Sequence, residues 1–372
     1  MITIILGTRP EIIKMSPIIR ECERKNRDYF ILHTGQHYSY AMDGVFFDEL
    51  ELPKAKYYLD VGSGTHAVQT GKIMAGIEEV LVQERPDIVL VQGDTNTVLA
   101  GALAASKLHI PVGHVEAGLR SDDRTMPEEV NRVVADHVSD YLYAPTELAR
   151  KNLVKEGIPE NAITVTGNTI VDALQENLRI AERRPDMLTP LGLEPKGYIL
   201  ATAHRQENVD DSAPLAGIIG GLERVRQHLD LPVIYPAHPR AEKMIAEFCI
   251  DTGGITMIKP VGFFAFLQLE SQARLILTDS GGVQEEACIL GVPCVTLREN
   301  TERPETIEVG ANVLVGTNPD VICKGAAMMM KTEPDWQQPF GDGYAGRMIV
   351  QISESVRYNR AACAMKAIEK SG

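Results

Sequence analysis

Four residues of this chain are suited by type to move protons at a carbon atom. Asp94, Glu116 and Glu128 carry carboxyl groups and His204 carries an imidazole, and each lies in a polar or glycine-rich cluster. Such a group can remove a carbon-bound proton and return one from the other face, provided that burial raises the pKa of at least one carboxylate. We therefore take these four as candidate catalytic residues.

Each acid also has an ordinary structural interpretation. Asp94 precedes a predicted helix and could be its N-cap, while Glu116 could pair with Arg120. Pro127-Glu128-Glu129 is typical of the first turn of a helix, where proline and acids are favoured. One acid alone would favour the structural interpretation, but three together with His204 favour chemistry.

A second candidate site would hold phosphate. Ser280-Gly281-Gly282 lies between the apolar run Leu275-Ile276-Leu277 and a helical run. Glycines there would let a phosphate approach the backbone, and the start of the helix offers free N–H donors; a tight turn capped by serine explains the same residues equally well. The sequence has no G-x-x-x-x-G-K-[ST] segment and no G-x-G-x-x-G after its first apolar run, so neither a kinase-type site nor a bound dinucleotide is indicated.

Three basic residues could balance the charge of a bound phosphate. Arg9, Lys14 and Arg303 stand near predicted strand ends or helix starts. Solvated surface charge is the commoner fate of such residues. The guanidinium of Arg303, within the charged segment 298–305, could bind a diphosphate through two of its N–H groups.

Strands and helices alternate along the chain. Short apolar runs predict strands at Ile2–Leu6, Tyr29–His33, Asp87–Val91, Val112–Val115, Tyr141–Tyr143 and Ile163–Val165, and again at Tyr198–Ala201, Val233–Tyr235, Ile255–Ile258, Leu275–Leu277 and Cys294–Thr296. Helical patterns lie between most of them, such as Glu11–Lys25, Ala67–Glu84 and Thr95–Leu108. This alternation predicts βαβ units and parallel sheets covered on both faces. Most of the polar clusters follow strand ends, where open α/β sheets bind ligands.

The alternation is interrupted once, which predicts two domains. It weakens between Arg183 and Lys196, where three prolines occur, and then restarts. We therefore expect two doubly wound α/β halves with a border between about residues 167 and 196. The expected domains are residues 1–168 with a C-terminal helix at about residues 351–372, and residues 169–350.

Composition limits the partners and the compartment. The chain has 372 residues and a net charge of −14, which disfavours nucleic acid and anionic membranes. It has no apolar run long enough to span a bilayer and its apolar start has no basic leader, so we expect a cytoplasmic protein. The six cysteines are scattered, which fits a reduced compartment and neither a disulfide framework nor a zinc site. His33 and His37 are spaced like metal ligands, but Thr34-Gly35 would break a helix between them, so we expect no metal site.

Eight clusters occur in order within the stretch from residue 7 to about residue 314. They are Gly7-Thr8-Arg9-Pro10-Glu11, Gln92-Gly93-Asp94-Thr95, His114-Val115-Glu116-Ala117-Gly118-Leu119-Arg120, Pro127-Glu128-Glu129-x-Asn131-Arg132, Thr166-Gly167-Asn168, His204-Arg205-x-Glu207-Asn208, Asp279-Ser280-Gly281-Gly282-x-Gln284-Glu285-Glu286 and Thr301-Glu302-Arg303-Pro304-Glu305. This ordered set resembles the non-hydrolysing UDP-N-acetylglucosamine 2-epimerases, and it covers most of the chain.

The resemblance implies a fold and a reaction. The fold is the GT-B type of α/β protein, with two doubly wound Rossmann-like domains and the active site in the cleft between them. The family acts as a homodimer without a nicotinamide cofactor; no other cofactor is expected. The reaction is the reversible C2 epimerisation of UDP-N-acetylglucosamine to UDP-N-acetylmannosamine, in which UDP is eliminated across C1–C2 to give 2-acetamidoglucal and is then added back.

The resemblance also implies roles for single residues. Asp94, Glu116, Glu128 and His204 match the catalytic positions. The positions that match the UDP-binding set are Arg9, Lys14, His238, Phe266, Ser280, Gly281, Gly282, Glu286 and Arg303. These roles agree with the local chemistry, because a leaving diphosphate needs N–H groups and cations whereas proton removal needs carboxylates.

One departure from the family pattern concerns regulation. Bacterial relatives carry a second UDP-N-acetylglucosamine beside the active site and need it for the reverse reaction. Gln36, His37 and Arg205 match that effector site, but Ser39 and Thr70 stand where the relatives have glutamine and arginine. Contacts to charged groups are worth roughly 1.5–3 kcal/mol each, although a nearby lysine could replace one of them. We expect the effector to bind weakly and the manno-to-gluco direction to run without it.

Four alternatives remain open from the sequence. The same chemistry could act on a modified sugar, such as a UDP-diacetamido uronic acid. A hydrolysing epimerase would release free N-acetylmannosamine, and a GT-B glycosyltransferase would need an acceptor. A nucleotide-sugar sensor would bind without reacting, but binding alone does not need all four candidate catalytic residues.

Overall fold

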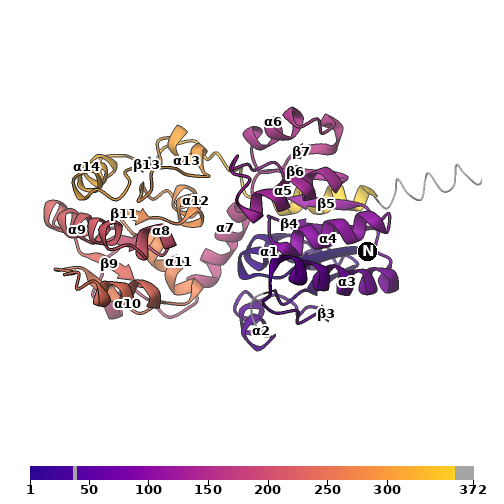
Figure 1. The fold of residues 1–372 in the computed structure, drawn as a ribbon, viewed down its shortest axis with the longest axis horizontal. Helices are drawn as coiled ribbons and strands as arrows, with labels where there is room; N and C mark the ends of the chain where they lie inside the picture. The colour runs from indigo at the N-terminus through magenta and orange to yellow at the C-terminus, as the bar shows by residue number, and fades with distance from the viewer. Residues whose placement is uncertain (37–39, 357–372) are drawn as a thin grey trace, which may run out of the picture. The chain divides into compact units, whose positions relative to one another are not determined.

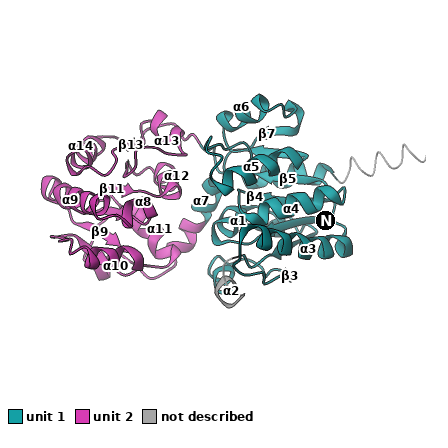
Figure 2. Ribbon diagram, viewed as in Figure 1, with its two compact units in different colours: residues 1–176, 340–372 teal, residues 177–339 magenta. Residues whose placement is uncertain are grey.

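The structure, a computed structural model, describes residues 1–36 and 40–356. The chain divides into two compact units (Figure 2): unit 1 comprises Met1–Glu176 with the C-terminal stretch from Phe340, and unit 2 comprises Asn177–Pro339. Each unit is built on one parallel sheet with helices, which is the α/β class expected from the sequence (Figure 1). Among the described helices, none is both long enough and apolar enough to cross a membrane.

Unit 1 holds a seven-stranded sheet in the order β3-β2-β1-β4-β5-β6-β7. Its strands are β1 (Ile2–Leu6), β2 (Tyr29–His33), β3 (Tyr57–Tyr58), β4 (Ile88–Gln92), β5 (Val112–Val115), β6 (Tyr141–Ala144) and β7 (Ile163–Val165). Its helices are α1 (Arg9–Arg24), α2 (Tyr40–Glu49), α3 (His66–Glu84), α4 (Asn96–Lys107), α5 (Pro127–Val138), α6 (Glu147–Lys155) and the 3-10 turn η1 (Glu160–Ala162). Helix α7 (Thr169–Ala181) begins in unit 1 and continues into unit 2. The chain winds outward from β1 to one edge and then from β4 to the other, which makes the sheet doubly wound.

Unit 2 repeats this design with six strands in the order β10-β9-β8-β11-β12-β13. The strands are β8 (Ile199–Thr202), β9 (Val233–Pro236), β10 (Thr256–Ile258), β11 (Leu275–Thr278), β12 (Cys294–Thr296) and β13 (Asn312–Leu314). The helices are the 3-10 turn η2 (Thr189–Leu191), α8 (Gln206–Val209), α9 (Ser212–Leu229), α10 (Pro239–Glu247), α11 (Phe263–Gln272), α12 (Gly281–Ile289), α13 (Pro304–Glu308) and α14 (Pro319–Met329). Two Rossmann-like units of this kind are what the GT-B expectation requires.

The central strands form because their apolar runs can be buried on both faces. Every residue of β1 and of β4 is buried, which suits β-branched residues in a sheet covered by helices on both sides. On one face, Ile73 and Ile77 of α3 belong to the same buried cluster as Val91 of β4. The cores therefore hold the carboxyl ends of the strands, and the polar turns that follow them, in fixed positions.

The two strands that the sequence did not predict are β3 and β13. Both lie at an edge of their sheet, and they have only two and three residues. The two residues of β3 are too few to show a hydrophobic period, and β13 begins with the polar residue Asn312. Predicted strand ends also shift slightly: the strand expected at Asp87–Val91 runs from Ile88 to Gln92.

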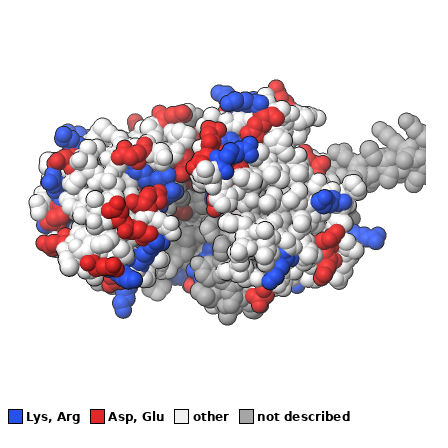
Figure 3. Space-filling view, in the orientation of Figure 1, with Lys and Arg blue, Asp and Glu red and all other residues white. Residues whose placement is uncertain are grey.

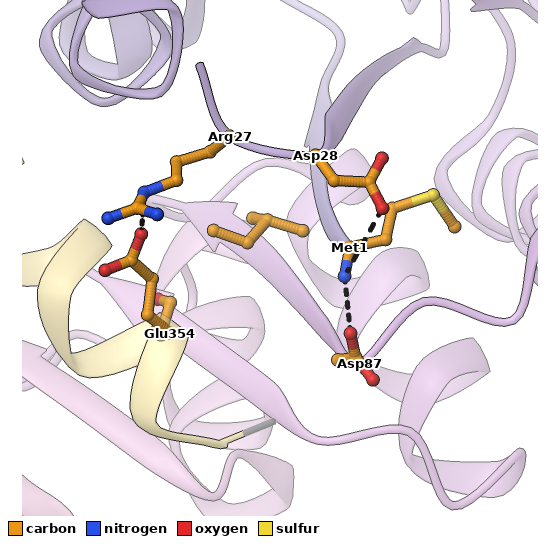
Figure 4. A pocket seen from close by; sticks show the side chains of 7 residues that line it. Met1, Arg27, Asp28, Asp87 and Glu354 are labelled. Carbon is orange, nitrogen blue, oxygen red and sulfur yellow. Dashed lines mark hydrogen bonds and ion pairs between the residues drawn. The ribbon is translucent and has the colours of Figure 1, made fainter. Parts of the chain in front are cut away.

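A small cavity in unit 1 is lined by residues from both ends of the described chain. Its volume is about 120 Å³, and Figure 4 shows its lining of Met1, Ile2, Arg27, Asp28, Asp87, Ser353 and Glu354. The Met1 ammonium group pairs with Asp87, and Arg27 pairs with Glu354. Glu354 belongs to a helix over residues 345–356, which thus packs on unit 1. The rest of the expected C-terminal helix, residues 357–372 with Cys363, lies outside the described residues.

Candidate active site

Two polar turns of unit 1 follow neighbouring strands. Gln92 ends β4 and Val115 ends β5, and the two residues are paired in the sheet register. Glu116 follows Val115 directly, and Asp94 follows Gln92 after one glycine, so the topology brings both acids to one edge of the sheet. Glu116 has a φ of 70°, a left-handed conformation that is uncommon outside glycine and asparagine and that occurs often at functional sites.

Two side chains bind the carboxylate of Glu116. Its Oε2 accepts hydrogen bonds from Lys14 Nζ at 2.6 Å and from Gln92 Nε2 at 2.6 Å. The ion pair is largely desolvated, because the side chain of Lys14 is 15% exposed and that of Glu116 is 6% exposed. Lys14, which the sequence placed in the UDP-binding set, therefore also fixes a candidate catalytic acid.

Both structural alternatives for the first two acids are wrong. The N-cap of α4 is Thr95, whose hydroxyl accepts from the Val98 N–H, and not Asp94. Arg120 does not pair with Glu116, because its guanidinium lies 2.7 Å from Asp136. The capping chemistry expected at Pro127-Glu128-Glu129 is present, since Pro127 opens α5 and both acids lie in its first turn.

Helix α5 positions Asp94. Arg132 donates from Nε to Asp94 Oδ2 at 2.9 Å, and its Nη2 lies 2.6 Å from the same oxygen. Asn131 Nδ2 donates to the main-chain carbonyl of Asp94 at 2.8 Å. One helical turn thus fixes both the backbone and the side chain of this acid.

Asp94 and Glu128 line one cavity of unit 1, with a volume of about 290 Å³. The remaining lining residues are Gln36, Ser63, Gly64, His66, Gln69, Thr95, Asn96, Pro127 and Asn131. The lining is rich in amides and hydroxyls, which can donate to and accept from the hydroxyl and amide groups of a sugar.

Glu11 is a buried acid at the same edge. Its carboxylate accepts hydrogen bonds from the N–H groups of Gly7 at 2.5 Å and Thr8 at 3.0 Å, and from the hydroxyl of Thr95. Burial raises the pKa of Glu11 to about 7; the hydrogen bonds oppose that rise and the charge of Asp94 adds to it. A carboxyl group that titrates near neutral pH therefore lies beside Asp94.

In unit 2, the buried carboxylate of Asp279 holds His204. Its Oδ2 accepts from the N–H groups of His204 and Arg205 at 2.9 Å each, and from Asn208 Nδ2 at 3.1 Å. Its Oδ1 lies 3.1 Å from His204 Nδ1, while the His204 side chain remains 51% exposed. Burial alone would raise the pKa of Asp279, but the contacts with His204 and Arg205 hold it below its usual value. The ring thus has one nitrogen fixed, and its other nitrogen is available for chemistry.

A second cavity, of about 240 Å³, lies in unit 2. Among its lining residues are four that the sequence predicted: His204, His238, Phe266 and Ser280. The remaining lining residues are Thr202, Ala203, Pro236, Pro260, Val261 and Val283. A largely apolar wall with an aromatic ring suits a flat heterocycle. His238 Nδ1 accepts from the Arg240 N–H at 3.2 Å, so a neutral His238 ring carries its proton on Nε2.

The glycines at the start of α12 are not required by the chain itself. Ser280 is the N-cap, as the structural interpretation expected, and its hydroxyl accepts from the Val283 N–H. A Cβ at Gly281 would come no closer than 3.6 Å to Glu302 Oε2, and one at Gly282 no closer than 3.8 Å to Ser280 Oγ. Neither glycine has a positive φ. Glycine is a poor helix former, so its use here favours the close approach of a ligand.

Two further predicted UDP-binding residues of unit 2 have acidic neighbours. Arg303 Nε lies 3.4 Å from the buried carboxylate of Glu285. Glu286 is hydrogen-bonded to Glu270, and burial, with the charge of Glu286, raises the pKa of Glu270 well above its usual value. The raised pKa favours the protonated form of Glu270, which can donate this bond to Glu286.

The structure describes the contacts of some of the remaining predicted residues. Arg9 of unit 1 lies over the ring of Phe46, with Cζ 5.6 Å from the ring centre. Gln36 Oε1 accepts from the N–H and the hydroxyl of Thr97 at 3.1 and 2.7 Å, and in unit 2 Arg205 lies 3.7 Å from Glu302. His37 and Ser39, which belong to the expected effector contacts, lie outside the described residues.

Three residues that position the acids and His204 were not identified from the sequence. Asp279, Gln92 and Arg132 all stand within the eight ordered clusters described above, and that position was the signal available. Their roles follow only from the topology that brings β4, β5 and α5 together in unit 1, and β8 and β11 together in unit 2.

Comparison with known proteins agrees with this geometry. The family model described as UDP-N-acetylglucosamine 2-epimerase matches residues 20–354. The UDP-N-acetylglucosamine 2-epimerase of Methanocaldococcus jannaschii is 55% identical over an alignment of 364 residues, and the match covers 96% of this chain and 100% of that protein. A crystal structure of the M. jannaschii enzyme in complex with UDP-GlcNAc and UDP has a TM-score of 0.83 and 56% identity, covering 94% of this chain and 98% of the other.

One relative acts on a different sugar. The UDP-2,3-diacetamido-2,3-dideoxy-D-glucuronate 2-epimerase of Pseudomonas aeruginosa is 42% identical over an alignment of 350 residues, and the match covers 93% of this chain and 97% of that protein. Both relatives are named for inversion at C2 of a UDP-sugar and differ in the sugar that carries it.

Proposed function

This chain belongs to the family of UDP-N-acetylglucosamine 2-epimerases, and from that premise we propose that it interconverts UDP-N-acetylglucosamine and UDP-N-acetylmannosamine. The observation that carries the proposal is the polar cavity of unit 1, which Asp94 and Glu128 line together. Glu116 follows the strand next to the one that precedes Asp94. Inversion at C2 needs one group to remove a proton and another to return it, and these carboxylates meet that need.

The proposed reaction is an elimination followed by an addition. A carboxylate of unit 1 takes the C2 proton, the C1–O bond breaks, and its electron pair leaves on UDP, which gives 2-acetamidoglucal. UDP then adds back at C1 while C2 receives a proton on the opposite face. We propose Asp94, Glu116 and Glu128 as the groups that move these protons, with Lys14 and Gln92 fixing Glu116.

Unit 2 is proposed to bind the leaving UDP. The N–H groups at the start of α12, together with Arg303, would stabilise the charge that develops on the diphosphate. Phe266 and His238 line the unit 2 cavity and suit the uracil ring. Glu286 of α12 is proposed to bind ribose hydroxyls. His204, held by Asp279, would hydrogen-bond to the leaving oxygen through Nε2.

The sugar is proposed to be uncharged. A uronate such as the P. aeruginosa substrate carries a carboxylate, for which lysine or arginine is the usual partner. Among the described residues that line the unit 1 cavity there is neither. We therefore favour UDP-N-acetylglucosamine over the diacetamido uronate as the substrate.

Proton NMR of the purified protein with UDP-N-acetylglucosamine tests the proposal. The manno isomer should appear with no added cofactor, and no free N-acetylmannosamine should accumulate. Free sugar would identify a hydrolysing enzyme, whereas conversion of the diacetamido uronate alone would identify the other substrate. A spectrum that stays unchanged with UDP-N-acetylglucosamine and with the diacetamido uronate would rule out the proposed function.

Assembly, compartment and regulation are also proposed from the family resemblance. We expect a cytoplasmic homodimer that supplies N-acetylmannosamine units for polysaccharide biosynthesis, and sedimentation measures the oligomeric state. We also expect weak effector control, because Thr70 on α3 replaces an arginine. A progress curve started from pure UDP-N-acetylmannosamine should show no lag; a long lag that trace UDP-N-acetylglucosamine abolishes would contradict this.

A further inference from the structure

His114 has no role in the reaction as described above, although it belongs to the same cluster as Glu116. It lies on β5 and is fully buried. Both of its ring nitrogens lie against oxygen atoms: Nδ1 is 2.7 Å from Asp136 Oδ1, and Nε2 is 2.8 Å from the carbonyl oxygen of Gly93. A carboxylate and a carbonyl are acceptors, so both nitrogens must donate, which only the doubly protonated ring can do.

The surrounding charges favour that cation. Asp136 on α5 is itself bound by Arg120 at 2.7 Å. Burial alone would lower the pKa of His114, but the Asp136 carboxylate, the Gly93 carbonyl and the charge of Glu116 together raise it. The next charged groups are those that bind these neighbours: Glu156 contacts Arg120, Lys14 contacts Glu116, and Arg132 contacts Asp94.

The carbonyl that His114 holds belongs to the turn between two functional residues. Gly93 stands between Gln92, which binds Glu116, and Asp94. Its N–H donates to the Val115 carbonyl at 3.1 Å, and its φ of 85° is the left-handed conformation that favours glycine. Strand β5 therefore holds both main-chain groups of Gly93. The Val115 carbonyl accepts from its N–H, and the ring of His114 lies against its carbonyl oxygen.

We propose that His114 is a positioning residue for both acids: its doubly protonated ring holds the Gly93 carbonyl and so keeps Asp94 and Glu116 in the geometry that proton transfer needs. This inference rests on the proposed function. If the ring loses its Nε2 proton, two acceptors face each other and the turn must move. Displacements of about 1 Å at a reacting group can lower turnover by about 10²-fold.

The protonation state is measured directly by NMR of protein labelled with ¹⁵N-histidine. The His114→Gln variant identifies the signals of this ring by their disappearance. We expect N–H signals from both ring nitrogens at neutral pH, and this readout does not depend on activity. A ring with one protonated nitrogen at neutral pH would overturn the proposal.

Kinetics of two variants test the role itself. In His114→Gln, the amide can donate to Gly93 or to Asp136 but not to both, and kcat should fall about 10²-fold with an unchanged Kd for UDP. In Asp136→Asn the ring loses its counter-charge, so kcat should fall at neutral pH and recover as the pH is lowered and the ring regains its proton. A purely structural residue would not shift the pH profile in this way.

The control is His137→Gln, which changes an exposed histidine of α5 that contacts only the Val133 carbonyl among the interactions described. It should match the wild-type protein. If His114→Gln turns over within twofold of an active wild type, or if Asp136→Asn shows an unshifted pH profile, the positioning role is wrong while the proposed function stands. A wild-type protein that does not epimerise UDP-N-acetylglucosamine at all overturns the function, and with it this role.

Discussion

His204 and Asp279 form a two-point contact in unit 2. Asp279 Oδ1 lies 3.1 Å from the ring nitrogen Nδ1 of His204, and Oδ2 accepts from the His204 main-chain N–H at 2.9 Å. An acid that holds both the backbone and the ring of a histidine fixes its tautomer, its orientation and the direction of its free nitrogen.

Asp279→Asn should therefore impair catalysis more than binding. The asparagine amide would face Nδ1 with either a neutral oxygen, which weakens the hydrogen bond from an Nδ1–H group, or an N–H group, which reverses the tautomer. We expect kcat to fall by about 10²-fold or more while the Kd for UDP changes little. The matched control is Asp210→Asn, which changes an exposed acid that is paired with Arg240. Equal turnover of the two variants would show that the contact with His204 has no catalytic role.

The three acids of unit 1 should show the same separation of catalysis from binding. Asp94→Asn, Glu116→Gln and Glu128→Gln are nearly isosteric and remove proton transfer, so each should lower kcat by about 10²–10⁴-fold. Isothermal calorimetry should find UDP affinity nearly unchanged, whereas Arg303→Ala and Ser280→Ala should weaken it. Near-normal turnover in all three acid variants would return these residues to a structural role.

Gly281→Ala should separate stability from ligand binding. The structure has room for the added methyl group, with its nearest neighbour at 3.6 Å, and alanine is the better helix former by up to about 1 kcal/mol. The variant should therefore be at least as stable as the wild type in urea, yet its UDP affinity should fall at least about tenfold because the methyl group blocks the diphosphate.

Gly220→Ala is the control for that variant. Gly220 lies within α9, where the added Cβ would sit 3.7 Å from Pro319, and its stability should rise with UDP affinity unchanged. Unaltered UDP binding by Gly281→Ala would mean that no phosphate approaches this turn.

The buried carboxyl group of Glu11 should make the free energy of unfolding decrease as the pH rises from 4.5 to about 7. Most carboxyl groups have already lost their proton in that range. The pKa of Glu11 is raised from 4.5 to about 7 in the folded protein, so the folded state holds this proton more tightly than the unfolded state. The resulting stabilisation is complete below pH 4.5 and is lost as the pH rises to about 7, a change of about 3 kcal/mol in the free energy of unfolding.

Glu11→Gln removes that titration and can keep the hydrogen bonds to Gly7 and Thr95. Chemical denaturation from pH 4.5 to 8 should show the decline in the wild type and a smaller decline in Glu11→Gln. The control is Glu147→Gln, which changes an exposed acid in the first turn of α6 and should decline like the wild type. Parallel curves for all three proteins would contradict the raised pKa.

The sequence predicted the elements whose signal is local. Continuous apolar runs identified β1 and β5 with their observed ends, and the helix over Ala67–Glu84 begins one residue earlier, at His66. The sequence also predicted two doubly wound units and the sheet edge at which the polar turns lie. Alternating strands and helices allow few other arrangements.

The side-chain partners could not be predicted, since they depend on contacts between distant segments. Glu116 binds Lys14 across 102 residues and not Arg120 four residues away. Asp279 reaches His204 across 75 residues, because β8 and β11 are neighbours in the sheet. The sequence placed such residues in clusters, but only the topology decides which clusters meet.

Deuterium incorporation tests the central claim most directly. The protein is incubated with UDP-N-acetylglucosamine in D₂O, and the C2 position of both epimers is followed by proton NMR. Because a carboxylate is proposed to remove the C2 proton and a different proton is returned, both UDP-N-acetylglucosamine and UDP-N-acetylmannosamine should gain deuterium at C2 as equilibrium is approached. Formation of UDP-N-acetylmannosamine that keeps its original C2 hydrogen would contradict the elimination mechanism and the role assigned to the acids of unit 1.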